Sequence, residues 1–341
     1  LFTARTAGEA VELEGWCKVA REHGLPTRML SKQELSEHAG TTTDEWCAGL
    51  YTSTDGRAEP HLAAPAIARA AARAGASIAT GCAVRGLRRD AGRIAAVVTE
   101  HGEIRTSTVL CAAGAWTSMF CRSLGIDLPQ LSVRGTVART GPAQLKLTGN
   151  LFDEKIGIRK RQDGGYTVAH GSVLDHGVTP STFRHSVKFL PALRHEFKVL
   201  RIRFGAEFFR ELRRPTRWPL DRPSPFEQER VLNPKPSDSQ LRELRSNLAK
   251  IWPELKDIPL VESWAGMVET TPDVVPVIGE ESSLPGFYIA TGFSGHGFGL
   301  GPGAGKAIAG MLNGKTNNID LSAFRRQRFY DGSPIKPYTA I

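Results

Sequence analysis

A cluster of glycines near the C-terminus constrains the fold of this chain more than any other feature. Seven glycines fall between Gly292 and Gly305, after a short apolar stretch over 287–290 and before a helix of small residues predicted from Gly303 to Leu312. Glycine lets a backbone turn sharply and approach a ligand, and the first turn of a helix presents free N–H groups. The pattern predicts a strand, a ligand-binding loop and a helix, with a loop that merely packs as the alternative.

Three common glycine motifs do not match this segment. Residues 299–304 have the letters of a GxGxxA dinucleotide fingerprint, but no second strand ending in a ribose-binding acid follows. A P-loop would need glycine at Leu300 and a hydroxyl residue at Ala307. The GxSxG elbow of serine hydrolases is broken at residues 292–296, where His296 replaces the last glycine. A nucleoside triphosphatase and a serine hydrolase are therefore excluded.

His296 is the histidine best placed for a function, because it lies between two glycines of the loop. It is a candidate for contact with a bound ring and for catalytic proton transfer, with a loop histidine satisfied by a backbone carbonyl as the alternative. The chain has neither HExxH nor paired CxxC spacing, so no metal site is expected.

Charge and cysteine content narrow the environment without naming a ligand. The chain has 44 basic and 35 acidic residues, a net charge of +9 that favours acidic partners only in general terms. Five cysteines without CxxC spacing predict free thiols and a reducing, cytoplasmic location. No apolar run is long enough to predict a transmembrane segment.

The first 110 residues alternate between helix and strand signals. Helices are predicted over 8–23, 31–38 and 62–74, where Thr6 is a candidate cap and Ser31 with Glu34 forms a capping-box pattern. Short strands are predicted over 77–80, 83–87, 94–99 and 103–110. This order predicts a layered α/β domain with an antiparallel excursion.

A basic segment over 183–236 reads as an insert on one face of a domain. One long helix is predicted there, with an inward apolar stripe formed by Leu193, Phe197, Leu200, Phe204 and Phe208. The insert is interpreted as a solvated helix face, with a contact between subunits of a homo- or hetero-oligomer as the alternative. Nucleic-acid binding is not expected, because the aromatic residues are not interleaved with the arginines.

Three ordered motifs resemble one family of enzymes. Residues 109–116, 271–279 and 291–299 resemble the FAD-dependent amine and amino-acid oxidoreductases of the D-amino-acid oxidase superfamily, which includes glycine oxidase, sarcosine oxidase and D-amino-acid dehydrogenases. Residues 51–60 and 133–135 are also similar. The likeness extends from Leu1 to about residue 314.

The resemblance implies a mixed α/β fold with two domains. An incomplete Rossmann-like FAD-binding domain is expected over 61–130 and 271–341, and an antiparallel-sheet substrate domain over 1–60 and 131–270. In this family the chain opens with a βαβ unit that carries a GxGxxG loop. This sequence begins with Leu1-Phe2-Thr3, so such a unit is expected upstream of Leu1.

The resemblance also implies non-covalent FAD and a set of cofactor contacts. These contacts are expected at the backbone of a strand, at the turn after 109–111 and at the glycine loop: Val84, Ala113, Gly114, Trp116, Gly292, Phe293, Ser294, Gly295, His296, Gly297, Phe298 and Gly299. Relatives oxidise a C–N bond by hydride transfer to flavin N5, and water hydrolyses the imine.

Substrate residues of the family are replaced here. Val268 stands where glycine oxidases and D-amino-acid dehydrogenases have a carboxylate-binding arginine, and Gly266 stands where sarcosine oxidase has its flavin-linking cysteine. Gly299 stands in place of a carboxylate-binding lysine. A carboxylate clamp is therefore expected from Arg134 or from the segment expected upstream of Leu1. Further candidate substrate contacts are Tyr51, Tyr166, His170 and Met267, with core or strand packing as the alternative for each.

Two functions are expected from these observations. The first is an FAD-dependent dehydrogenase or oxidase of an amine, a D-amino acid or an opine-like compound. The second is a non-catalytic or assembly subunit of a heteromeric flavin dehydrogenase that docks through the 183–236 insert.

Overall fold

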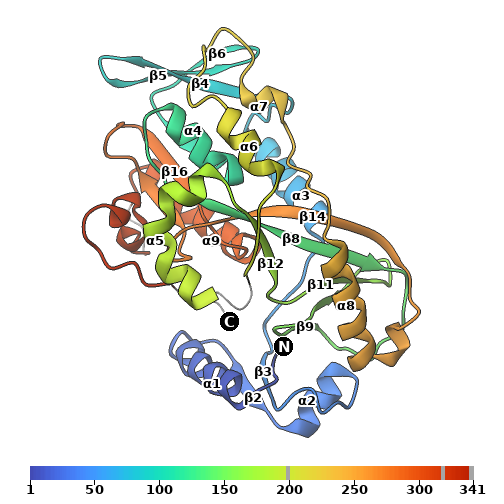
Figure 1. Cartoon of the computed structure of the whole chain (residues 1–341). Coiled ribbons are helices and arrows are strands. Elements are labelled where there is room, and N and C mark those ends of the chain that lie inside the picture. The colour runs from blue at the N-terminus through green and yellow to red at the C-terminus, as the bar shows by residue number, and fades with distance from the viewer. Residues whose placement is uncertain (197–199, 316–318, 338–341) are drawn as a thin grey trace.

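The computed structural model describes residues 1–196, 200–315 and 319–337, and its largest element is a ten-stranded mixed sheet (Figure 1). Nine strands follow the order β13-β12-β8-β11-β10-β9-β1-β3-β2, and β14 pairs with β8. Their bounds are β1 Phe2–Ala4, β2 Thr27–Leu30, β3 Ala48–Thr52, β8 Leu131–Thr140, β9 Asn150–Phe152, β10 Gly157–Lys160, β11 Tyr166–Ala169, β12 Leu174–Gly177, β13 Leu200–Arg203 and β14 Leu260–Thr270.

Two smaller sheets of three strands each complete the fold. One has the order β15-β16-β7, and the other is an antiparallel β4-β5-β6 meander. The bounds are β4 Val84–Asp90, β5 Arg93–Thr99, β6 Gly102–Arg105, β7 Val109–Cys111, β15 Val277–Glu280 and β16 Phe287–Thr291. The predicted mixed α/β class is confirmed. The large sheet draws its strands only from 1–60 and 131–270, and the small sheets draw theirs only from 61–130 and 271–341.

Nine α-helices are described in these ranges. They are α1 Ala7–Glu22, α2 Lys32–Ala39, α3 Pro60–Arg73, α4 Thr117–Ser123, α5 Pro180–Glu196, α6 Ala206–Arg213, α7 Pro225–Gln228, α8 Asp238–Ile251 and α9 Gly297–Leu312. The predicted caps are confirmed: Thr6 accepts from the Glu9 N–H, and Ser31 and Glu34 form a capping box.

Two predicted strands were wrong. Residues 77–80 form no strand. The predicted strand over 103–110 divides into β6 and β7, because the Thr106 hydroxyl donates to the Thr108 carbonyl and accepts from the Thr108 N–H. Such local side-chain bonds compete with a strand ladder and produce a turn.

The single long helix predicted in the basic segment was also wrong. Leu200 lies in β13, which pairs in parallel with β12, and Gly205 then precedes the separate helix α6. Phe204 is 66% exposed rather than inward. Phe197 lies outside the described residues. Helical spacing of apolar residues did not reveal this strand, because the pairing partner on β12 is distant in sequence.

The C-terminal helix begins earlier than predicted. α9 starts at Gly297 rather than Gly303, so the glycine loop proper covers only 292–296. Glycine disfavours helix by about 1 kcal/mol per residue but does not forbid it. The chain can therefore remain helical through Gly299, Gly301 and Gly303.

Two main cores stabilise these layers. One lies between the large sheet and α8 and includes Tyr166 and Trp252, whose indole N–H donates to the Ala39 carbonyl at 3.0 Å. The second packs β16 against α4 and includes Phe120 and Phe287. Figure 1 shows α8 beside the large sheet and α4 near the β4–β6 meander.

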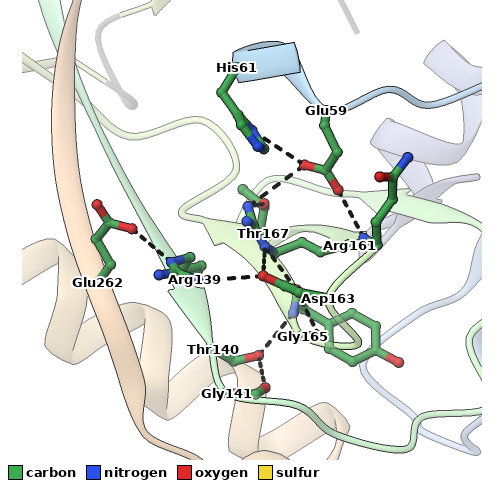
Figure 2. Close-up of polar contacts among 12 residues, drawn as sticks. Glu59, His61, Arg139, Thr140, Gly141, Arg161, Asp163, Gly165, Thr167 and Glu262 are labelled. Carbon is green, nitrogen blue, oxygen red and sulfur yellow. Dashed lines mark hydrogen bonds and ion pairs between the residues drawn. The ribbon is translucent and has the colours of Figure 1, made fainter. Parts of the chain in front are cut away.

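The segment that leads into α3 is tied to the large sheet through Glu59. This buried carboxylate accepts from Arg159 Nη2 at 3.0 Å and from the Gln162 N–H at 3.0 Å. Arg161 is 3.7 Å from it. Figure 2 shows the surrounding network, which continues through Asp163 to Arg139.

The cysteines are not paired in disulfides within the described residues. Cys17, Cys111 and Cys121 are buried free thiols, and Cys47 is exposed. No helix in the described ranges combines the length and apolar character needed to cross a membrane.

Candidate functional site

Gln130 joins the turn after β7 to the glycine loop after β16. Its Nε2 donates to the Gly114 carbonyl at 3.1 Å and to the Thr291 hydroxyl at 2.9 Å. Its Oε1 accepts from the Ser118 N–H at 2.9 Å. Because Gln130 is buried, these bonds are protected from water and hold the two segments side by side. Two motifs separated by about 180 residues thus form one surface.

The glycine loop is fixed against the end of β14. The Ser294 N–H donates to the Glu269 carbonyl at 3.2 Å, and Ser294 itself adopts a φ of 52°. Gly292 has a φ of 74°, and a Cβ at this position would lie 2.4 Å from Cγ2 of Thr271. Only glycine fits Gly292 without displacing its neighbour.

The segment that supports Gly292 is itself anchored. The Thr271 hydroxyl donates to the Val275 carbonyl at 2.8 Å. Asp273 accepts from Arg328 Nε at 2.7 Å and Nη2 at 3.0 Å. A bidentate pair of this kind is directional, so it fixes the 271–275 turn. The T-P-D-V-V-P motif therefore positions the glycine loop.

Four glycines of α9 are open on two sides of the helix. A Cβ added at Gly299, Gly301, Gly303 or Gly305 would meet no described atom within 4 Å. Phe298 is 57% exposed and Leu300 is 50% exposed, although the helix is apolar along its length. The N–H groups of 297–299 precede the first i to i−4 bond of α9, which runs from Leu300 to His296.

These features fit FAD. Free N–H groups at the start of a long helix suit electron-rich oxygen atoms, and an open glycine face lets a large ring or chain approach the backbone. Ala113 is exposed, Gly114 has a φ of 54°, and Trp116 is half-buried in the adjoining turn. Val84 is half-buried at the start of β4 and packs against the second core.

His296 immediately precedes α9 and is exposed. Its N–H donates to the Phe293 carbonyl at 2.9 Å, which closes the loop. Within the described part of the chain, its imidazole has no hydrogen bond. The ring is thus accessible to a ligand, and its part in proton transfer stays a prediction.

A cavity of about 710 Å³ adjoins the turn after β7. Ala115 and Gln130 line it at this turn, and Met267 of β14 lines it on the sheet side. The basic segment, together with the start of α5, lines another wall. Its lining residues there come from α5, β13, α6 and the chain that follows: Ser181, Arg184, His185, Arg203, Phe204, Glu207, Arg210, Glu211, Arg214, Glu229 and Lys235.

Asp175 joins two arginines in this cavity. Its Oδ2 accepts from Arg134 Nη2 at 2.8 Å, and its Oδ1 accepts from Arg203 Nε at 3.0 Å. Burial opposes ionisation of Asp175, but the two guanidinium groups outweigh it and hold its pKa below the ordinary value. Two cations share one carboxylate, so this wall of the cavity favours an anion.

The Arg134 guanidinium has an N–H donor that no described residue accepts from. Besides the bond to Asp175, its Nη1 donates to the Lys235 carbonyl at 3.2 Å. Its Nε is buried and has no partner among the described residues. Arg134 lies opposite Met267 in the β8–β14 register, so the structure brings these two predicted substrate residues together.

Two histidines also line the cavity. His176 is buried between the Ser132 carbonyl, 2.9 Å from Nδ1, and the Thr182 hydroxyl, 3.0 Å from Nε2. Burial lowers the pKa of His185, and Arg184 and Lys188 add to this effect against the opposing charge of Asp127. The His185 ring therefore favours the neutral form at physiological pH.

The other predicted substrate residues lie outside this lining. Tyr166 is fully buried in the first core, where its hydroxyl accepts from the Leu145 N–H at 3.3 Å. Tyr51 stacks on His38 at a second, smaller cavity of about 220 Å³. His170 lies 3.8 Å from Glu243, and its Nδ1 is buried without a partner in the described ranges.

Sequence reasoning missed the cavity residues of the basic segment. Arg184 and Arg203 belong to a segment that was interpreted as a solvated face. The excess of arginine there was a signal, but its position over a cavity depends on the pairing of β12 with β13. That pairing is a tertiary contact without a local pattern.

Comparisons with known proteins agree with this arrangement. A family model described as FAD dependent oxidoreductase matches residues 1–311. Glycine oxidase from Pseudomonas aeruginosa is 26% identical over 241 residues, covering 71% of this chain and 51% of that protein. Mitochondrial sarcosine dehydrogenase from Mus musculus is 24% identical over 336 residues, covering 97% of this chain and 32% of that protein. The chain thus spans about half of the first relative and about a third of the second.

Two solved structures are similar over most of the chain. L-amino acid deaminase from Proteus myxofaciens, in complex with anthranilate, is 31% identical with a TM-score of 0.91. The similarity covers 97% of this chain and 75% of that one. L-amino acid deaminase from Proteus vulgaris is 29% identical with a TM-score of 0.88, covering 96% of this chain and 77% of that one.

Proposed function

The chain belongs to the family of FAD-dependent oxidoreductases, and on this premise we propose that its cavity binds an amine or amino acid whose carbon–nitrogen bond is oxidised. The observation that carries the proposal is the position of Gln130 between the two glycine segments and the cavity. Gln130 holds Gly114 and Thr291 together and also lines the cavity. A cofactor on the glycine surface and a substrate in the cavity would therefore lie next to each other.

The glycine surface would hold FAD without a covalent link. The residues that fit this role are Gly114, the loop 292–296 and the start of α9. When bound, FAD supplies the acceptor for the two electrons removed as a C–N bond becomes an imine, which water then hydrolyses. The N–H groups near 297–299 would stabilise negative charge on the bound ring edge. On this basis we assign residues 61–130 and 271–341 to an FAD-binding domain.

The substrate would be oriented by its carboxylate at Arg134. This side chain is held by Asp175, so its position is set before the ligand arrives. The resemblance implied an arginine at position 268, where this chain has valine. Arg134 lies on β8, the strand that pairs with β14, and its free donor supports the same task from the neighbouring strand.

The basic segment would exclude water from the site. α5, β13 and α6 carry side chains over the cavity, and Arg203 on β13 shares Asp175 with Arg134. A substrate anion at Arg134 would thereby be covered by the segment that contacts the same carboxylate. Exclusion of water strengthens the electrostatic contacts inside the cavity.

The experiment is a substrate survey on the intact protein with bound flavin. Glycine, sarcosine and D- and L-amino acids are added anaerobically, and loss of the visible flavin absorbance is followed. Acid precipitation then shows whether the flavin is released. Bleaching by at least one of these compounds, with release of free FAD, is expected. Flavin that resists all of them would contradict the proposed substrate class.

A second candidate is supported by one observation. Phe183, Phe204 and Phe209 are exposed, and their rings contact Phe208 or each other on the basic segment. Such a patch suits docking by a partner subunit. An intact protein that contains no flavin, and that forms a defined complex lost on Phe183→Ser and Phe209→Ser substitution, would favour this candidate over the first.

A further inference from the structure

The charges that line the large cavity do not balance. Its lining includes seven Lys and Arg residues and five Asp and Glu residues, an excess of two positive charges before the histidines are counted. A cavity with this excess favours an anion, and a ligand with two negative charges would neutralise it. The positions of the cations show where the two charges of such a ligand would be held.

Four arginines in the lining already have acidic partners. Arg134 and Arg203 share Asp175, Arg214 contacts Glu229 at 2.7 Å, and Arg210 lies 3.6 Å from Glu207 in the same helix. The Arg134 and Arg203 pair still carries one charge more than Asp175. This extra positive charge would be neutralised by the first substrate carboxylate at Arg134.

Arg122 on α4 and Arg184 on α5 differ from these groups. Neither guanidinium group forms an ion pair or a hydrogen bond in the described part of the chain, although both residues line the cavity. The nearby carboxylates are engaged elsewhere. Glu211 accepts from the Ser181 hydroxyl at 2.5 Å and N–H at 3.0 Å, and Asp127 accepts from the Tyr330 hydroxyl at 2.6 Å.

The two guanidinium groups are close enough to influence each other. Burial lowers the pKa of Arg122, and the positive charge of Arg184 lowers it further, against the opposing effect of Glu211 and Asp127. Two neighbouring guanidinium groups with unused donors are suited to a carboxylate or a phosphate. Lys235, the remaining cation without an ion pair in the described lining, is exposed.

We propose that Arg122 and Arg184 together bind a second anionic group of the substrate, so that the preferred substrate is an amine or amino acid carrying two negative charges. This inference rests on the proposed function, because it takes Arg134 as the site of the first carboxylate. The two residues that would determine this specificity lie on α4 and α5, whereas Arg134 lies on β8.

The test compares two aromatic amines that differ by one carboxylate, anthranilate and 2-aminoterephthalate. Their dissociation constants are measured with the intact flavin-loaded protein by isothermal calorimetry, which requires no turnover. The wild type is expected to bind 2-aminoterephthalate about tenfold more tightly, as charge-assisted hydrogen bonds allow. The double variant Arg122→Gln and Arg184→Gln is expected to lose this preference while anthranilate affinity changes less than about threefold.

Arg210→Gln is the matched control, because Arg210 lines the same cavity but already lies beside Glu207. It should keep the preference. Equal affinity of the wild type for both probes, no binding of 2-aminoterephthalate, or equal weakening of both probes in the double variant would each overturn the inference. Loss of bound FAD from the double variant would assign the pair to the cofactor's phosphates and would also overturn it. The proposed function is tested separately, by loss of flavin absorbance with the compounds of the substrate survey.

Discussion

Arg134 on β8 donates from Nη2 to Oδ2 of Asp175 on β12 at 2.8 Å, between two strands whose residues line the cavity. Arg203 on β13 contacts the other oxygen of the same carboxylate. A single buried acid thus connects the central sheet to the basic segment that covers the cavity. In the proposed function, orientation of the substrate and exclusion of water would both depend on this group.

Asp175→Asn should destabilise the protein by about 3 kcal/mol. Removal of a buried carboxylate leaves two arginines without their counter-charge, which costs more than the loss of an exposed pair. The free energy of unfolding from urea titration measures this change. Glu207→Gln at the same cavity removes only an exposed pair and should cost less than about 1 kcal/mol. Equal losses in the two variants would show that Asp175 has no special structural role.

Arg134→Gln should raise KM about 10- to 100-fold for a carboxylate substrate, with a smaller effect on kcat, because a charge-assisted contact is lost. Steady-state kinetics on the substrate found in the survey provides the two values. Arg139→Gln is the control, since Arg139 is on the same strand but pairs with Glu262 at 2.7 Å. An unchanged KM in the Arg134 variant would place the substrate carboxylate elsewhere.

Gly292→Ala should destabilise the protein by about 3 kcal/mol. The residue adopts a φ of 74°, and a methyl group would clash with Thr271. Thermal and urea denaturation measure the loss. A variant as stable as the wild type would mean that the loop readily shifts away from Thr271.

Gly299→Ala is expected to behave differently, although it is another glycine of the same motif. A Cβ there meets no described atom, and alanine favours helix over glycine by about 0.5–1 kcal/mol. Stability should therefore be kept or raised, while FAD affinity falls about tenfold because the methyl group occupies the proposed cofactor surface. Titration of the apoprotein with FAD measures this, and unchanged affinity would remove Gly299 from the cofactor site.

Glu59 should contribute to the loss of stability in acid. Hydrogen bonding to Arg159 holds its pKa below the ordinary value, against the opposing effect of burial. Because the folded-state pKa is depressed, the stabilisation is complete above the unfolded value of about 4.3 and is lost as the pH falls through the folded value. Glu59→Gln should therefore lower stability at pH 7 and flatten its decline below about pH 4.3.

The comparison variant for this acid effect is Glu262→Gln. Glu262 lies in the same region of Figure 2, but its side chain is 56% exposed. Its loss should cost less than about 1 kcal/mol and leave the pH dependence nearly unchanged. An acid profile that is identical in wild type and Glu59→Gln would contradict the role of Glu59.

The sequence predicted those features that depend on nearby residues. The cap at Thr6, the capping box at Ser31 and the glycine loop all arise from local chemistry, and all are present. β13 was missed because it is stabilised by pairing with β12 rather than by its own pattern. The cavity cations were missed for the same reason, since Arg122 and Arg184 are distant in sequence and line one cavity only in the folded chain.

The central claim is that the glycine surface binds FAD beside the cavity, and equilibrium flavin content tests it most directly. The intact protein is purified, loaded with excess FAD, passed through a desalting column and examined for visible flavin absorbance, with Gly299→Ala treated in parallel. The account predicts FAD in equimolar amount in the wild type and much less in the variant. A wild-type protein that retains no flavin, or a variant that retains the same amount, would contradict it.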